Sequence, residues 1–576
     1  MTNENREGPS RRDFVREVVG LGVLSGLGLS PRPLWAVVES ASAERARRVE
    51  HHLSIDHAGV SIGGTRRHAV TIDGAVPGRL LRLREGDEAV IHVTNNLDED
   101  TSIHWHGILL PFDQDGVPGI SFDGIRPGET FTYRFPIRQA GTYWYHSHSG
   151  GQEQQGMYAP LVIEPAAGDP VAYDRDHVLV LSDWTDEHPM EVLRNLKGDG
   201  GYYNYGKRTL PGLLGGLFSG DGATVRDRAA WGRMRMDPTD IADVTGATYT
   251  FLLNGRTAAE NWTALFRPGE RARLRLINAA AMTYFDFKIP GLRMSVVQAD
   301  GQDVEPVEVD ELRIAVAETY DVVVEPRGGE AYTIFAQAMD RSGFVRGTLA
   351  EREGAEAPVP ALDPRPRRTM ADMGGMPGHD MPMPDMPMPA AGPPAGAPAG
   401  GHDGHAPPPP QTDHAAHADH AAMMPPAGEG GHRKLAYGDL RALVPNADVR
   451  EPERDLVVRL TGDMERYFWT LNDRKYTQSE PVTLRLGERI RLVMTNETMM
   501  EHPMHLHGAF MELQNGEPSE RAPRKHVIDV QPGETVEAHV TFDEPGPWLF
   551  HCHLMYHMMT GMTLLLNVVD ADAGQE

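Results

Sequence analysis

The chain reads Leu484-Arg485-Leu486-Gly487-Glu488 and then, four residues later, Val493-Met494-Thr495-Asn496. This stretch decides the fold because two further copies of its pattern are present: a turn with glycine and an acidic residue, then a strand-like run ending in asparagine. The other copies are Leu83-Arg84-Glu85-Gly86-Asp87 with Val93-Thr94-Asn95, and Phe266-Arg267-Pro268-Gly269-Glu270 with Leu276-Ile277-Asn278. The repetition predicts three structurally similar units.

Two more signals recur in each unit. A strand ending in Asn-Gly or a near equivalent lies upstream, at Ile72-Asp73-Gly74, Leu253-Asn254-Gly255 and Leu471-Asn472-Asp473. A turn and another strand lie downstream, at 127–130 with 141–145, 317–319 with 331–335, and 532–535 with 546–550. Alternating runs such as residues 130–135 are typical of half-buried strands, so the chain is predicted to be all-β, with three β-sandwiches. We place these domains at 48–167, 170–350 and 436–572, with a linker at 351–435.

Composition narrows the classes of partner. With 576 residues, the chain is long enough for several domains. The net charge of −27 argues against nucleic acid, whose phosphates need a basic surface, and favours cations such as metal ions. A single cysteine cannot form a disulfide within the chain, and metal ligation would explain a lone thiol in an exported protein.

The N-terminus carries an export signal. Ser10-Arg11-Arg12-Asp13-Phe14-Val15 precedes an apolar run over 18–29, and small residues at 41–43 indicate cleavage nearby. We therefore predict a twin-arginine signal peptide at 1–43, export by the twin-arginine machinery and a periplasmic location. The rest of the chain has no apolar run of about 18 residues, so the mature protein is expected to have no membrane span.

Four His-x-His pairs set the two outer units apart from the middle one. The pairs are His104 with His106, His146 with His148, His505 with His507, and His551 with His553. Residues i and i+2 of a strand share a face, so each pair presents two imidazoles together, and imidazole is a good metal ligand. The middle unit has Phe285-Asp286-Phe287 and Phe335-Ala336-Gln337 at the matching places. We interpret it as a spacer without metal ligands.

The cysteine belongs to a second site. Cys552 lies between His551 and His553 and therefore points to the other side of the strand. His502, His557 and Met562 are near it in sequence, giving two imidazoles, a thiolate and a thioether. These are the ligands of a blue-copper electron-transfer centre.

These motifs resemble those of the multicopper oxidases. The matching residues are His104-x-His106-Gly107, His146-x-His148, His502-x-x-His505-x-His507-Gly508, and His551-Cys552-His553 with His557 and Met562. Flanking runs at 104–118, 143–155, 502–513 and 523–526 are similar to the copper-resistance protein A subfamily of the bacterial periplasm. The likeness covers nearly the whole chain and implies cupredoxin-like Greek-key domains.

The resemblance also implies a division of the ligands among four copper ions. His502, Cys552, His557 and Met562 would hold a type 1 copper, and His104 with His505 would hold a type 2 copper. The type 3 pair would be held by His106, His146, His148, His507, His551 and His553. Electrons would pass from Cys552 through its two neighbouring histidines to the three-copper cluster, where four of them reduce dioxygen to water.

Two carboxylates are candidates for proton delivery. Asp115 lies eleven residues after His104 and matches a family carboxylate near the type 2 copper. Its alternative role is that of a turn residue in Gln114-Asp115-Gly116. Many relatives have an acidic residue directly after the second type 1 histidine, where this chain has Met558, so Glu153 is our candidate for a second proton relay.

The linker contains an insert rich in methionine and histidine. Residues 370–432 hold nine methionines and seven histidines among Pro, Ala and Gly, a composition that predicts disorder. Thioethers select Cu(I), so the insert is predicted to bind additional copper and to raise its concentration near the type 1 site. The alternative is an inert flexible linker.

A second group of methionines surrounds the type 1 ligands. Met499, Met500, Glu501 and Met555 are candidates for docking Cu(I), because soft sulfur with a carboxylate suits that ion. The alternative is that the methionines are adaptable core residues.

The favoured function is oxidation of Cu(I) by dioxygen in periplasmic copper tolerance, with other copper-handling proteins as partners. A laccase-like phenol oxidase is the first alternative, since a type 1 copper accepts electrons from many donors. A copper-storage protein is the second, although storage does not require four ordered His-x-His pairs.

Overall fold

The asparagine that ends each repeated stretch makes the same set of hydrogen bonds in all three domains. The side-chain amides of Asn95, Asn278 and Asn496 each donate to two backbone carbonyls and accept one backbone N–H two residues later. At Asn496, for example, the amide nitrogen lies 2.7 Å from the Met500 oxygen and 2.9 Å from the Val530 oxygen. All three side chains are buried, so the repeated asparagine fixes the loop that follows each strand.

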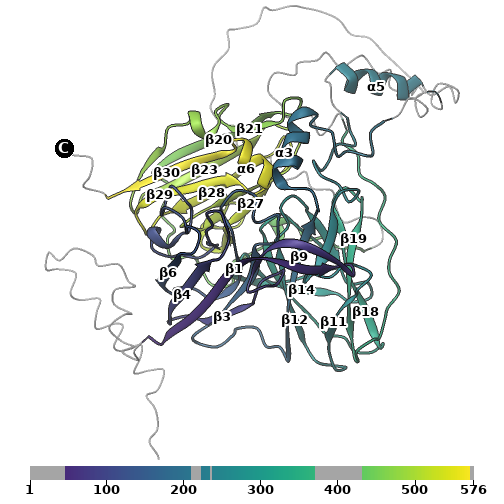
Figure 1. The fold of residues 1–576 in the computed structure, drawn as a ribbon, viewed down its shortest axis with the longest axis horizontal. Coiled ribbons are helices and arrows are strands. Elements are labelled where there is room, and N and C mark those ends of the chain that lie inside the picture. Colours follow the sequence, from purple (N-terminus) through teal and green to yellow (C-terminus); the bar gives the residue numbers. More distant parts are fainter. Residues whose placement is uncertain (1–45, 209–213, 215–221, 234–236, 370–430, 571–576) are drawn as a thin grey trace, which may run out of the picture. The chain divides into compact units, whose positions relative to one another are not determined.

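The computed structural model describes residues 46–208, 214, 222–233, 237–369 and 431–570. Strands dominate these described residues and form six sheets, two in each domain (Figure 1). The predicted all-β fold of three sandwiches is therefore confirmed. The predicted signal peptide at 1–43 and most of the Met- and His-rich insert lie outside the described residues.

The first domain contains two four-stranded sheets with the orders β2-β1-β4-β6 and β3-β8-β7-β5. Its strands are β1 (Arg48–Ile62), β2 (Thr65–Ile72), β3 (Leu81–Arg84), β4 (Glu88–Asn95), β5 (His104–His106), β6 (Thr130–Pro136), β7 (Gly141–His146) and β8 (Tyr158–Glu164). Because β5 pairs antiparallel with β7, His104 lies opposite His146.

The second domain contains a six-stranded sheet, β10-β9-β12-β17-β14-β15, and a five-stranded sheet, β11-β19-β18-β13-β16. Its strands are β9 (Arg175–Trp184), β10 (Thr250–Leu253), β11 (Trp262–Leu265), β12 (Ala272–Asn278), β13 (Phe285–Lys288), β14 (Met294–Ala299), β15 (Gln302–Val309), β16 (Glu311–Ile314), β17 (Thr319–Val324), β18 (Ala331–Ala338) and β19 (Phe344–Ala350). Helices α3 (Pro189–Gly198) and α5 (Gly222–Arg233) precede β10.

The third domain repeats this plan with the orders β21-β20-β23-β28-β25-β26 and β22-β30-β29-β24-β27. Its strands are β20 (Arg454–Asp463), β21 (Phe468–Leu471), β22 (Val482–Arg485), β23 (Arg489–Asn496), β24 (His502–Leu506), β25 (Met511–Leu513), β26 (Arg524–Lys525), β27 (Val527–Val530), β28 (Thr535–Thr541), β29 (Gly546–Cys552) and β30 (Thr563–Val569). Helix α6 (Met555–Thr560) follows β29. Short 3₁₀ turns occur at η1 (Phe112–Gln114), η3 (Tyr437–Asp439), η4 (Tyr476–Gln478) and η5 (Ser519–Arg521).

The strand pairing explains the repetition in the sequence. The first strand of each domain runs parallel to the strand that carries the asparagine, in the pairs β1–β4, β9–β12 and β20–β23. A second parallel pair closes the other sheet, in β3–β8, β11–β19 and β22–β30. The upstream turns also match, since Asp73, Asn254 and Asn472 all adopt positive φ, which asparagine and aspartate tolerate better than most residues.

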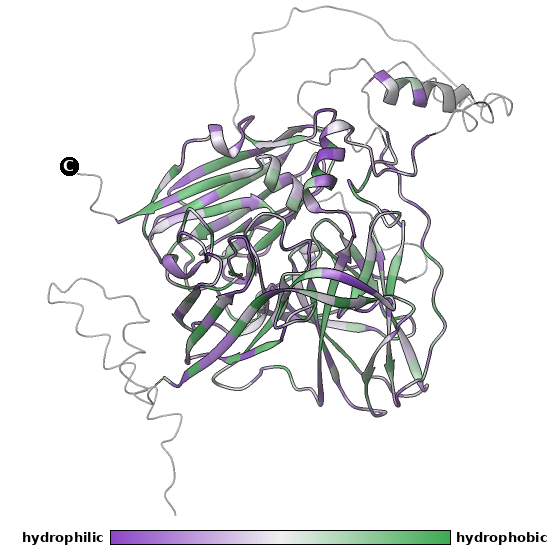
Figure 2. Ribbon diagram, viewed as in Figure 1, coloured by the Kyte–Doolittle hydropathy of each residue, from purple (hydrophilic) through white to green (hydrophobic). Residues whose placement is uncertain are grey.

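Hydrophobic residues recur along the strands of the sandwiches (Figure 2), and the core they form is continuous through all three domains. Buried charges connect the domains. Asp321 accepts hydrogen bonds at 3.0 Å from Thr142 of the first domain and from Arg275. Lys525 of the third domain lies 3.0 Å from Asp300 and from Glu318 of the second. These deeply buried pairs fix the position of each domain relative to its neighbour, because breaking a pair would leave an unpaired buried charge. No helix among the described residues is long and apolar enough to cross a membrane.

Candidate metal centres

The cysteine centre combines β24, β29 and α6 of the third domain. The Cys552 Sγ atom lies 3.6 Å from His502 Nδ1 and 3.7 Å from His557 Nδ1, and these two nitrogens are 3.1 Å apart. All three side chains are inaccessible to solvent, as is Met562, whose carbonyl accepts the Cys552 backbone N–H at 3.1 Å. Two nitrogens and a thiol sulfur therefore converge on one point, the arrangement that a trigonal metal site requires.

The Nε2 atoms of His502 and His557, on the side of each ring away from Cys552, also have hydrogen-bond partners. His502 Nε2 lies 2.7 Å from the Thr498 hydroxyl, and His557 Nε2 lies 2.7 Å from Asp243 Oδ2. The Trp469 ring stacks on His557 at a centroid distance of 4.0 Å. These contacts leave Nδ1 of both histidines facing the sulfur. Outer partners of this kind orient metal ligands before the ion arrives.

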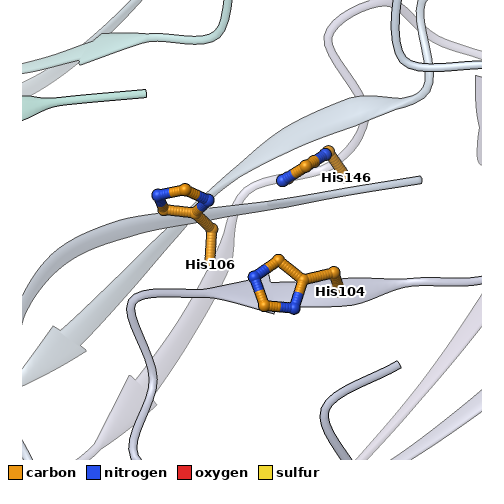
Figure 3. A group of neighbouring side chains, drawn as sticks. All are labelled: His104, His106 and His146. Carbon is orange, nitrogen blue, oxygen red and sulfur yellow. The ribbon is translucent and has the colours of Figure 1, made fainter. Parts of the chain in front are cut away.

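The eight paired histidines meet where the first and third domains face each other. His104, His106 and His146 surround a shared space (Figure 3). The third domain adds His505 and His507 beside His104, and His148 joins His507 and His551. Within each of these groups the ligand atoms lie within 4.8 Å of one another. His553 completes the set, with its ring 4.9 Å from that of His106. Strand alternation thus brings all eight predicted imidazoles together.

Hydrogen bonds at Nδ1 orient several of these rings. His104 donates to the Asp115 carbonyl at 2.8 Å, His505 to the His526 carbonyl at 2.8 Å, and His551 to the Cys552 carbonyl at 3.0 Å. Eight ring nitrogens of the cluster are buried without a hydrogen-bond partner among the described residues. They are Nε2 of His104, His146, His148 and His505, and both nitrogens of His106 and His553. Buried polar atoms normally have partners, so this cluster of unpaired nitrogens fits a group of bound metal ions.

Burial lowers the pKa of several imidazoles of the cluster. Desolvation lowers the pKa of His148 to about 3 and of His551 to about 4. Desolvation and the neighbouring rings lower the pKa of His507 well below its usual range. Neutral imidazole is the form that binds metal, so protons do not compete for these nitrogens near neutral pH. At the cysteine centre, burial raises the thiol pKa of Cys552 well above its usual value, so a metal ion must displace its proton.

Asp115 links the two halves of the histidine cluster. Its carbonyl holds His104, and its carboxylate Oδ2 accepts the His507 Nδ1–H at 2.8 Å. Gly116 permits this approach, because its φ is +79° and a Cβ there would lie 1.7 Å from the Ile103 carbonyl oxygen. Asp115 is only 3% exposed, and this one buried residue positions one histidine from each outer domain, His104 through its carbonyl and His507 through its carboxylate.

Glu153 lies in the turn between β7 and β8. Its Oε2 is 3.0 Å from His146 Nδ1, and its Oε1 is buried without a partner among the described residues. Burial, and then the charge of Asp183, raises the pKa of Glu153 well above its usual range. A buried carboxyl group with a raised pKa holds its proton to higher pH, and beside His146 it is placed to donate that proton.

The four candidates for Cu(I) docking separate into different places. Met500 and Glu501 line a cavity beside the cysteine centre, whereas Met555 lines another cavity with His146, His148 and Glu153. Met499 is buried and belongs to neither group of lining residues. The first cavity, which we call the acidic cavity, is also lined by Asp243, Met282, Met339 and Asp340 of the middle domain. The middle domain, interpreted above as a spacer, therefore contributes carboxylates and thioethers beside the cysteine centre.

Sequence reasoning missed two kinds of site residue. Asp243, which holds His557, lies in an irregular segment of the middle domain, and no repeated motif marks it. His526 is a ninth imidazole at the histidine cluster, with its ring 4.8 Å from that of His106 and neither ring nitrogen hydrogen-bonded among the described residues. It packs on Gly107, where any Cβ would lie 2.4 Å from the ring. In the sequence, the only signal for His526 was the similarity of the run 523–526 to the copper-resistance protein A subfamily.

Comparison with known proteins agrees with this geometry. Family models described as multicopper oxidase match residues 55–168, 175–353 and 450–572. Copper resistance protein A of Pseudomonas syringae pv. tomato is 50% identical over 599 residues, covering 96% of this chain and 98% of that protein. The Escherichia coli protein of the same name is 47% identical, with the same coverage. The crystal structure of Fet3p, a multicopper oxidase that functions in iron import, matches 91% of this chain and 90% of its own with a TM-score of 0.65 at 19% identity, and so shows the fold alone.

Proposed function

This chain belongs to the multicopper oxidases, copper enzymes that pass electrons to dioxygen, and on that premise we propose that it oxidises Cu(I) as part of copper tolerance. The observation that carries the proposal is the acidic cavity. Three carboxylates and three thioethers line it directly beside the cysteine centre. Apolar residues such as Ile241, Val244 and Phe251 complete the lining, but it is the thioethers and carboxylates together that suit a soft monovalent cation better than a phenol.

We assign the ligands as the family likeness implies. His502, Cys552, His557 and Met562 would hold one copper, and the eight paired histidines would hold three more. Copper bound at these places supplies one-electron transfer at the cysteine and four-electron reduction of dioxygen at the cluster. Cys552 is adjacent in the chain to His551 and His553, so electrons have a covalent route of a few bonds between the two centres.

The carboxylates then have separate roles. Asp243 orients His557 at the point where the acidic cavity meets the cysteine centre. Asp115 orients His104 and His507 and is the first candidate to deliver protons to the cluster. Glu153, whose pKa is raised by burial, lies beside His146 and acts as the second relay. Each residue touches a ligand histidine directly, which supports a role in catalysis rather than in folding alone.

Three finer assignments are part of the same proposal. The domain limits are 48–167, 170–350 and 436–572. Residues 1–43 direct export to the periplasm by the twin-arginine route, and the insert within 351–435 binds further copper. The chain is similar to copper resistance proteins over nearly its full length, which supports a role among copper-handling proteins.

The test compares two neighbouring methionines. Met500→Leu removes a thioether from the acidic cavity, while Met499→Leu changes a buried methionine outside it and is the matched control. We expect the first variant to lose most Cu(I) turnover and to keep phenol turnover, both measured by oxygen uptake. Equal losses with the two donors, or equal effects of the two substitutions, would reject docking in this cavity. Phenol turnover without Cu(I) turnover in the wild type would make the enzyme a phenol oxidase.

A further inference from the structure

A cation of the protein itself is paired with a carboxylate that lines the acidic cavity. The Arg368 guanidinium forms an ion pair with Glu501, the residue that directly precedes the ligand His502. Glu501 is 3% exposed, and the Arg368 side chain is 13% exposed. A carboxylate this deeply buried is costly without a positive partner, so Arg368 supplies the charge that a bound Cu(I) would otherwise supply.

Arg368 is carried by a short segment, residues 363–368, which we call the strap. The strap is anchored at its start, where the Asp363 carboxylate lies 3.0 Å from Lys288 Nζ. Further along, Arg365 Nε donates to the Asp340 carbonyl at 3.2 Å, and the Arg368 backbone N–H donates to the Pro238 carbonyl at 2.8 Å. The strap therefore lies against the cavity wall and presents two guanidinium groups to its carboxylates.

The ion pair uses only part of the guanidinium. One terminal nitrogen of Arg368 bonds to Glu501, while its Nε is buried without a hydrogen-bond partner among the described residues. The second guanidinium is held more loosely, since Arg365 and Asp340 are 3.9 Å apart and Asp340 Oδ2 makes no hydrogen bond in the described part of the chain. Arginine binds carboxylates most strongly through two parallel hydrogen bonds. A one-sided pair is easier to displace.

We propose that Arg368 is a displaceable internal cation that sets the affinity and the selectivity of the acidic cavity for Cu(I). This inference rests on the proposed function. Cu(I) enters and the guanidinium leaves, so the net charge of the cavity is the same before and after the exchange. An ion that binds thioethers can offset the lost ion pair through Met282, Met339 and Met500, whereas a hard, hydrated cation gains nothing from sulfur. Arg368 thus excludes ordinary cations and admits soft ones.

The experiment uses the full-length, copper-loaded protein and two variants. Arg368→Gln removes the competing charge, and Arg367→Gln removes the same charge from an exposed neighbour as the matched control. The probes are Cu(I), followed by oxygen uptake, and Ag(I), a redox-inert soft cation, followed by inhibition of phenol turnover. Loss of a charge-assisted hydrogen bond should lower both the KM for Cu(I) and the half-inhibiting Ag(I) concentration about tenfold in Arg368→Gln. The control should change neither by more than about twofold. Unchanged or raised values in Arg368→Gln would overturn the proposal.

Glu501 variants keep the proposal testable if the single variant does not fold. Glu501→Gln and the double variant Glu501→Gln/Arg368→Gln are compared, since the double variant leaves no unpaired buried charge. Without the Glu501 carboxylate, Arg368 no longer competes with Ag(I) for that group, so adding Arg368→Gln to Glu501→Gln should leave the half-inhibiting Ag(I) concentration nearly unchanged. A difference above about threefold would overturn the role assigned to Arg368. Absence of Cu(I)-driven oxygen uptake in the wild type would instead reject the proposed function, and the Ag(I) comparison would still decide the role of Arg368.

Discussion

Asp243→Asn should raise the reduction potential of the cysteine centre. Asp243 Oδ2 lies 2.7 Å from His557 Nε2 and accepts a second hydrogen bond from the Tyr467 hydroxyl at 2.8 Å. The side-chain oxygen of asparagine can still accept from His557, so the substitution removes a negative charge and keeps the ligand in place. Oxidised copper carries one more positive charge than reduced copper. The carboxylate therefore stabilises oxidised copper more than reduced copper. Asp243→Asn removes this preference, so the reduction potential rises.

The magnitude follows from the geometry. Adding about 2.2 Å across the imidazole and about 2.0 Å for a metal–nitrogen bond places the carboxylate about 7 Å from the ion. At an effective dielectric constant of about 20, one charge at that distance contributes about 2.4 kcal/mol. For a one-electron couple this corresponds to a rise of about 100 mV. Asp243 is only 4% exposed, so solvent screens this interaction little.

The assay is a redox titration followed through the visible absorption of the copper–cysteine bond, at pH 6.5. Asp240→Asn is the matched control. Burial, together with the charge of Asp243, raises the pKa of Asp240 to about 8, so at pH 6.5 this neighbour is already neutral and its replacement should leave the potential unchanged. A rise below about 20 mV in Asp243→Asn, or a fall, would refute the electrostatic reasoning.

Three further predictions concern the histidine cluster. Asp115→Asn removes the charge that accepts the His507 N–H, so turnover measured by oxygen uptake should fall about 100-fold with copper content retained; retained turnover would leave Asp115 a turn residue. Glu153→Gln removes a proton donor whose pKa burial raises, so turnover should fall at low pH and approach the wild-type value above that raised pKa; parallel pH profiles would exclude a relay through Glu153. Burial lowers the pKa of His551 to about 4. As the pH falls from 6.5 to 4, the metal-free wild type should therefore lose about 1.4 kcal/mol of stability per pH unit relative to His551→Asn. Urea unfolding measures this, and a stability difference that does not change with pH would contradict it.

The sign of that last effect follows from proton binding. The unfolded chain takes up a proton at this histidine near its ordinary pKa of about 6.5, whereas the folded chain does so only near 4. Between these values the unfolded state binds more protons, so folding weakens as the pH falls. Above 6.5 neither state binds a proton at His551, and its contribution is constant.

The sequence predicted the architecture well because local rules determine it. The repeated turns and the terminal asparagines, as in Asn496, predicted three copies of one sandwich. Strand alternation alone was enough to predict that His551 and His553 would point away from Cys552. Membership of the multicopper oxidases and the all-β fold are confirmed. The ligand assignments remain predictions, supported by imidazoles that converge as the spacing requires.

What the sequence could not predict comes from contacts between domains. Asp243 reaches His557 across more than three hundred residues, and irregular segments such as the one around Asp243 have no periodicity that would reveal which side chains they present. The four docking candidates were grouped by their closeness to His502 and His557 in sequence. However, Met500 lies on the loop before β24 and Met555 begins α6, so the two line different cavities. Arg368 belongs to the linker, whose composition gave no sign of an ion pair with Glu501.

The proposed chemistry is tested most directly by the number of dioxygen molecules that the copper-loaded protein consumes per Cu(I) added. The measured uptake is corrected for spontaneous oxidation, and Cys552→Ser is the control. Four complete His-x-His pairs beside one cysteine centre predict one dioxygen consumed per four Cu(I), with no hydrogen peroxide released and no uptake above background in the control. One dioxygen per two Cu(I) with peroxide in the medium, or the same uptake in Cys552→Ser, would contradict it.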